Sequence, residues 1–111
     1  MEERRLKVRF PIIEAARYHV YDKRRVSISG IGQTVNFSSS GALVRVQHPV
    51  SLFQTMEMAV EWPFLLDNHI QLQFVAAGRV VRVERGCVAI EFERHEFRTA
   101  RSEGARKGIA Q

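Results

Sequence analysis

Alternation of apolar and polar residues is the feature that most constrains how this chain folds. In the run Met56–Trp62 every second side chain is large and apolar, and Pro63 ends the run. The run Val88–Phe92 repeats the pattern. Successive side chains of a β-strand point to opposite faces, so a period of two predicts strands with one buried face.

More strand-forming segments follow one another, separated by turn residues such as Asp22-Lys23 and Glu84-Arg85-Gly86. Gly30 and Gly32 are expected to interrupt the pattern, and Gly78 to mark a bulge or bend. About six or seven short strands are expected, over residues 17–21, 26–29, 34–36, 42–46, 56–62, 72–83 with Gly78 inside, and 88–92. Short strands with tight connections predict an all-β domain, either an antiparallel barrel or a sandwich.

The two ends of the chain lack this pattern. Residues 1–11 are dense in charge and close with Pro11, which predicts a flexible N-terminal arm. The strand pattern then defines a domain over residues 12–97. The period of two is lost from His95, and a short helix is expected over residues 97–106. Residues 98–111 are therefore assigned as a C-terminal helix and tail.

Length and composition allow one domain with a real core. The chain has 111 residues, of which 45% are hydrophobic, and 17 Lys and Arg against 12 Asp and Glu give a net charge of +5. No apolar run is long enough to span a membrane, and the charged N-terminus leads into no signal-like segment. A single cysteine, Cys87, fits a reducing compartment, so a cytoplasmic location is expected.

Enzymatic chemistry finds no support in the residue types and their spacing. Cys87 lies among apolar residues and is expected to be a small core residue rather than a nucleophile. Glu57 and Glu61 fall on the expected outer face of one strand. The four histidines have no partner at metal-ligand spacing; they are His19, His48, His69 and His95. We therefore expect no catalytic residues, no metal site and no cofactor.

Two short elements stand out. The first is Arg5-Leu6-Lys7-Val8-Arg9, with two arginines four residues apart. The second is Asn36-Phe37-Ser38-Ser39-Ser40-Gly41, at the junction of two expected strands. Taken singly, the first is explained by a solvated basic tail and the second by a serine-rich turn that bonds its own backbone.

In this order on a small β domain, the two elements resemble the signature of the PilZ domain family. Arg5 and Arg9 match its RxxxR element, and Asn36, Ser38 and Gly41 match its [D/N]xSxxG element. The resemblance covers about residues 4–97. It implies a six-stranded antiparallel split barrel, often with a C-terminal helix, and it implies that these five residues bind cyclic di-GMP.

The chemistry of the five residues is consistent with that implication. An arginine fork matches the O6 and N7 acceptors of guanine, and it also pairs with phosphate. Ordering of the arm over the barrel by a dianionic ligand would change the protein surface. The expected recipient of the signal is a downstream protein or a second copy of this chain, with no membrane partner.

Three other interpretations remain open from the sequence. An adaptor of the same fold could act through protein contacts without binding nucleotide. A nucleic-acid-binding barrel is disfavoured, because most aromatic residues fall at expected core positions or chain ends instead of interleaving with basic residues on one face. A structural subunit without any ligand is the third.

Overall fold

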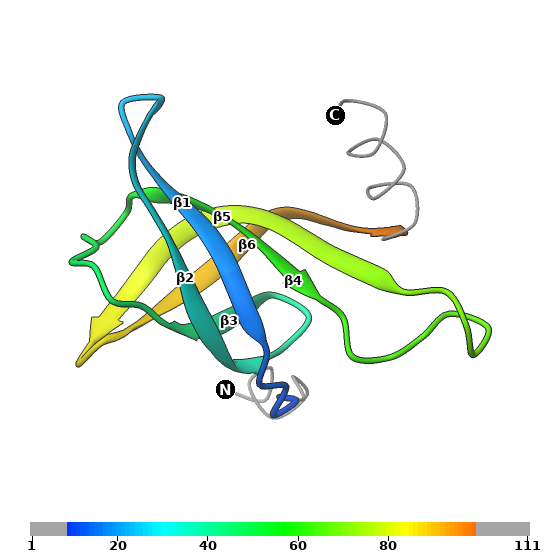
Figure 1. The fold of residues 1–111 in the computed structure, drawn as a ribbon. Helices are drawn as coiled ribbons and strands as arrows, with labels where there is room; N and C mark the ends of the chain where they lie inside the picture. The colour runs from blue at the N-terminus through cyan, green and yellow to red at the C-terminus, as the bar shows by residue number, and fades with distance from the viewer. Residues whose placement is uncertain (1–8, 100–111) are drawn as a thin grey trace.

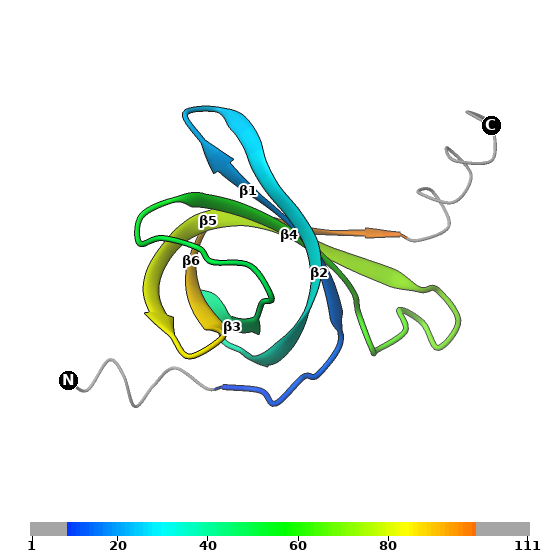
Figure 2. The same cartoon turned by 60° about the vertical axis from the view of Figure 1, so that its left-hand side comes forward.

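The structure, a computed structural model, describes residues 9–99, which form six antiparallel strands (Figure 1). The strands are β1 (Ala15–Asp22), β2 (Arg25–Phe37), β3 (Gly41–Arg45), β4 (Thr55–Glu61), β5 (Leu72–Glu84) and β6 (Cys87–Thr99). They pair in the order β1-β2-β3-β6-β5-β4, and β4 pairs back to β1. The ring in Figure 2 is therefore a closed barrel, which confirms the predicted fold class.

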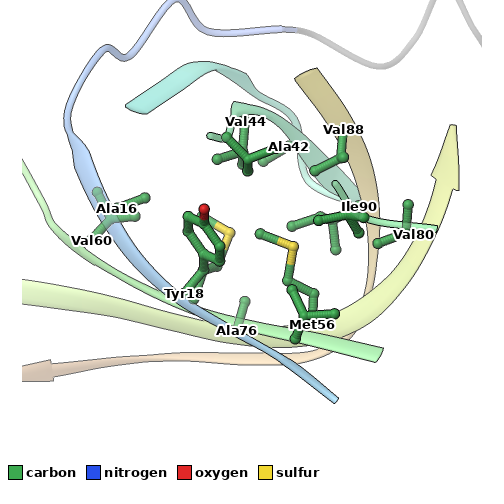
Figure 3. Close-up of a cluster of buried hydrophobic side chains, with 14 of the residues drawn as sticks. Ala16, Tyr18, Ala42, Val44, Met56, Val60, Ala76, Val80, Val88 and Ile90 are labelled. Atoms are coloured by element: carbon green, nitrogen blue, oxygen red, sulfur yellow. The ribbon is translucent and has the colours of Figure 1, made fainter. Parts of the chain in front are cut away.

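The alternating side chains fill the inside of this ring. In β4, Met56, Met58 and Val60 are buried, while Glu57 and Glu61 lie on the outer face as predicted. Figure 3 shows the inward side chains of the other strands converging on the same centre. Burying an aliphatic or aromatic side chain contributes about 1.5–3 kcal/mol, so this interior is the main source of stability.

One core residue carries a polar atom. The Tyr18 side chain is 0% exposed and lies among the core side chains (Figure 3). Its hydroxyl lies 2.8 Å from Nδ1 of His48 in a hydrogen bond. A Cβ at Gly30 would lie 2.7 Å from that hydroxyl oxygen. Gly30 is therefore required by packing, and β2 runs through Gly30 and Gly32 without the predicted interruption.

The bulge predicted at Gly78 is confirmed. The β5–β6 register shifts between Ala77 and Gly78, because Ala77 pairs with Arg94 and Gly78 pairs with Phe92. The extra residue is thus Glu93 on β6. The bulge bends the long hairpin, and the start of β5 and the end of β6 project beyond the ring in Figure 2.

The predicted helix start at residue 97 is wrong. Strand β6 continues to Thr99, which pairs with Leu72 of β5. Most residues of this outer part of β6 are exposed, so no alternation marks them as a strand. The rest of the predicted helix and tail lies outside the described residues.

No helix able to cross a membrane occurs within residues 9–99.

Aromatic rings gather at the end of the barrel where β2 and β4 finish. The Phe37 ring lies 5.4 Å from the rings of both Trp62 and Phe74. Edge-to-face pairs of this kind add about 0.5–1.5 kcal/mol to area burial, so they anchor the end of β2.

Candidate ligand-binding site

The first motif reaches the barrel through a backbone pair. The Phe10 amide donates to the Phe37 carbonyl at 2.6 Å, and the Phe37 amide donates to the Phe10 carbonyl at 2.8 Å. Because the pair is antiparallel, Arg9 lies alongside Ser38, the residue that follows Phe37. Arg5 lies outside the described residues. Of the predicted site residues, Arg9 and Ser38 are thus neighbours although 29 positions separate them (38 − 9).

Thr34 holds the segment between Phe10 and β1 against β2. Its hydroxyl donates to the Ile12 carbonyl at 2.5 Å and accepts from the Glu14 amide at 2.9 Å. The Thr34 amide also donates to the Glu14 carbonyl. Besides Tyr18, Thr34 is the one residue of the described chain whose side chain is buried and carries a polar atom. Phe10, which lies inside the segment assigned to the arm, is thus already bonded to the barrel.

A β-bulge turns Asn36 to the outside of the barrel. Thr34 is buried and pairs with Val44, but the next pair is Asn36 with Leu43. Val35 is the extra residue, and without it the period of two would place Asn36 inside. The Asn36 side chain has no hydrogen-bond partner in the described part of the chain, and neither has the exposed Arg9. Both polar groups are therefore free to bind a ligand.

Ser38 and Gly41 have roles within the turn itself. The Ser38 amide donates to the Gly41 carbonyl at 2.8 Å, and the Ser38 hydroxyl accepts from the Ser40 amide at 3.3 Å. A Cβ at Gly41 would overlap the carbonyl oxygen of Ile90 on β6. Gly41 has no positive φ, so the requirement for glycine there is close approach between strands.

Cross-strand register adds two arginines that the sequence did not single out. Asn36 pairs with Leu43, Leu43 with Ala89, and Ala89 with Arg82, so one transverse row joins the second motif to β5. Arg82 forms an ion pair with Glu84 at 2.7 Å. Both side chains are exposed, and exposed ion pairs contribute little to stability.

The second row runs from Gly41 to Glu91 and on to Arg79. No local signal distinguishes Arg79 or Arg82 from other surface arginines, because only the pairing register aligns them with the motif. We call the outer face of β2, β3, β6 and β5 the motif face; it carries Asn36, Arg79 and Arg82.

Groups suited to metal or nucleophilic chemistry do not gather on this face. Across residues 9–99, no three His, Cys, Asp or Glu side chains are close enough to hold a metal ion. Cys87 is half-buried as the first residue of β6, opposite Arg45, and not in the core as predicted. The strand alternation places Val88 inward, so its neighbour Cys87 points the other way.

Comparisons with known proteins agree with this fold. A family model described as "PilZ domain" matches residues 3–103. Among solved structures, the PilZ domain of CeSA from a cellulose-synthesizing bacterium is similar, with a TM-score of 0.59 and 20% identity. That match covers 78% of this chain and 81% of the other. No significant relative was found among curated proteins.

Proposed function

Since the chain belongs to the PilZ domain family, a family of receptor and adaptor domains, we propose that it binds cyclic di-GMP and passes the signal to another protein. The observation that carries this proposal is the placement of Arg9. The Phe10–Phe37 backbone pair holds the second arginine of one motif beside Ser38 of the other. Arg9 of the first motif thus lies beside the second motif.

The residues of this surface fit the ligand's chemistry. Cyclic di-GMP carries two phosphates and two guanines, and guanidinium groups bind both. Arg9 and Asn36 have no partners to give up within the described chain, so binding would break no existing side-chain hydrogen bond of theirs. We assign Arg5 and Arg9 to guanine and phosphate, and Asn36 to a base edge.

Transmission of the signal would start at the same place. Contacts of the ligand with Arg5 and Arg9 would fix residues 1–9 against the motif face. Ordering costs about 1–2 kcal/mol per residue fixed, so several charge-assisted bonds must form. The altered surface would then be recognised by a downstream protein or by a second copy of the chain.

A second function, that of an adaptor that does not bind nucleotide, is favoured by one observation. Ser38 and Gly41 are both explained by the turn and by the approach of β3 to β6. Two of the motif residues would thus be needed for the fold alone. Arg5, Arg9 and Asn36 are the residues that separate the two functions.

Calorimetric titration with cyclic di-GMP tests the proposal. We expect saturable binding by the wild type, and loss of about tenfold or more in affinity for Arg9→Ala, because one charge-assisted contact contributes about 1.5–3 kcal/mol. Arg5→Ala should behave in the same way. Thermal unfolding of Arg9→Ala should match the wild type, because the exposed side chain has no partner in the described chain.

The controls separate the alternatives. Arg85→Ala removes an exposed arginine of the β5–β6 turn and should leave affinity unchanged. Absence of heat at about 50 μM ligand, a concentration that detects binding free energies of about 6 kcal/mol or more in magnitude, would favour the adaptor without nucleotide. Binding of single-stranded DNA in place of the nucleotide would favour a nucleic-acid barrel.

A further inference from the structure

A groove of about 800 Å³ lies on the outside of the barrel, away from the motif face. Its lining comes from β2, β1, β4, β5 and β6, and neither Asn36 nor Gly41 takes part. Five adjacent strands span about 19 Å, which exceeds the diameter of about 10–12 Å of an α-helix with its side chains. Figure 2 shows that the β1–β2 hairpin and the outer ends of β5 and β6 project beyond the ring.

Two transverse rows of paired residues form this groove. The first row consists of Ile31, Arg17, Ala59, Val75 and Glu96. Ala59 and Val75 have short side chains at its centre and make a low apolar floor. Ile31 stands at one side and is 63% exposed, which leaves a large apolar side chain without cover.

The second row consists of Ser29, His19, Glu57, Ala77 and Arg94. Ala77 is small enough that the Arg94 guanidinium reaches over β5 to within 3.7 Å of the Glu57 carboxylate. The His19 ring bonds the Ser29 hydroxyl at 2.8 Å. The floor of the groove is thus apolar along one row and polar along the next.

The charges of the groove leave an excess of positive charge. Its two carboxylates have partners, since Glu57 accepts from Tyr21 at 2.9 Å and Glu96 accepts from Arg98 at 2.6 Å. Arg17 lies beside Ala59 and Ile31 and has no ion-pair partner in the described part of the chain. A ligand carboxylate at this position would meet an unpaired guanidinium.

A basic turn extends the positive charge. A second concavity of about 420 Å³ shares Glu57 with the groove and is lined by Lys23 and Arg24 of the β1–β2 turn. Both residues have positive φ, 52° and 72°, as in tight two-residue turns. The groove therefore leads from an apolar floor to a cationic end.

We propose that this groove binds an acidic amphipathic helix of a partner protein. Within the described residues β3 pairs with β2 only over Gln33–Phe37 and with β6 only over Cys87–Glu91, so the projecting parts of β2 and β6 each have one edge without a neighbouring strand. A β-strand added at either edge would extend the sheet beside the groove and leave its floor uncovered. Polyproline ligands need aromatic-lined grooves, and the Tyr18 ring is fully buried. A helix can lay apolar side chains over Ala59 and Val75 while its carboxylates reach Arg17 and the basic turn.

Other occupants fit the charges less well. Residues 100–111 carry three basic side chains and one acidic one, so they do not complement this groove. A nucleic-acid phosphate backbone has no apolar face to cover Ala59, Val75 and the exposed Ile31. The proposal does not depend on the binding of cyclic di-GMP.

The experiment uses a fluorescein-labelled peptide of about 18 residues, about 27 Å long as a helix, with Leu at positions i, i+3, i+4 and i+7 and Glu at most others. Fluorescence anisotropy should show saturable binding with a dissociation constant below about 100 μM. The analogue with Lys in place of Glu should bind about tenfold more weakly or not at all. Amide shifts in NMR spectra should concentrate on Ala59, Val75 and Ala77.

Variants with the same charge change provide the control. Arg17→Glu should lower the affinity for the acidic peptide by about tenfold or more. Arg85→Glu, on the β5–β6 turn outside the groove, should leave that affinity unchanged. Circular dichroism of both variants should match the wild type, because both positions are exposed.

Three results would overturn the proposal. They are the absence of peptide binding, equal binding of the Lys analogue, and amide shifts at the exposed Phe64–Leu66 loop instead of the groove. Binding of an oligothymidine that Arg17→Glu abolishes would instead make the groove a nucleic-acid site.

Discussion

The two outer faces of this barrel are built from similar strands in different ways. On the motif face, a bulge turns Asn36 outward and Gly41 lets β3 approach β6 closely. On the groove face, the two rows of paired residues cross from β2 through β1 and β4 to β5 without a register shift, since the β1–β2 shift between Val20 and Tyr21 lies beyond these rows, and small residues make the floor. The first face thus depends on backbone irregularities, and the second depends on side-chain size and charge.

The largest expected effect tests the backbone dependence of the motif face. Gly41→Val should destabilise the protein by about 3 kcal/mol, because the new side chain overlaps a backbone carbonyl of β6 that has little room to shift. Ala59→Val enlarges a residue on the groove face and should change stability by about 0.5 kcal/mol or less. Urea unfolding of both variants measures the difference, and equal losses would remove the contrast between the faces.

The anchoring of the segment before β1 comes next. Thr34→Val removes the hydroxyl that bonds Ile12 and Glu14 and should destabilise the protein by about 1–2 kcal/mol. Thr34→Ser keeps the hydroxyl and should restore most of that loss. An unchanged unfolding midpoint for Thr34→Val would show that the backbone bonds of Phe10 with Phe37 and of Thr34 with Glu14 hold the segment without the hydroxyl.

A pair of arginine variants sharpens the comparison of binding functions. Arg82 lies on the same transverse row as Asn36, so we predict that it also contacts the ligand. Arg82→Ala should weaken the binding of cyclic di-GMP by about tenfold and leave the binding of the acidic peptide unchanged. Arg17→Ala on the groove face should have the opposite pattern. Titration of both variants with both ligands checks this, and a variant that weakens both ligands would mean that the two faces are coupled.

The smallest effect is a titration on the groove face. The hydrogen bond from Tyr21 to Glu57 raises the pKa of Tyr21 above its ordinary value of 10.0. The folded state thus favours the neutral phenol. The hydrogen bond therefore stabilises the folded state below pH 10.0, and this stabilisation is lost as pH rises through the raised pKa of Tyr21.

Glu57→Ala removes the hydrogen-bond acceptor, which is the main cause, and should lower the pKa of Tyr21 toward 10.0. Carbon NMR of the tyrosine ring measures this pKa, with Tyr21→Phe identifying the resonance. An unchanged pKa in Glu57→Ala would mean that the hydrogen bond to Glu57 does not raise it.

Much of the fold followed from local pattern, and the errors have a physical cause. The alternation in β4 predicted its buried side correctly, because that strand has one face in the core and one in solvent. The outer end of β6 was mistaken for a helix, because most of its residues face solvent and no period of two survives there. Gly30 was taken for an interruption, whereas packing against Tyr18 requires it.

The sequence by itself determined the all-β class and the order of two motifs that resemble the PilZ signature. Period and residue type are properties of each short segment, so they can be recognised without the rest of the chain. The tertiary structure alone decided that Asn36 faces outward, that Arg9 lies beside Ser38, and that the rows of the groove align. These placements depend on bulges and register between strands distant in sequence, which only the pairing of the whole barrel sets.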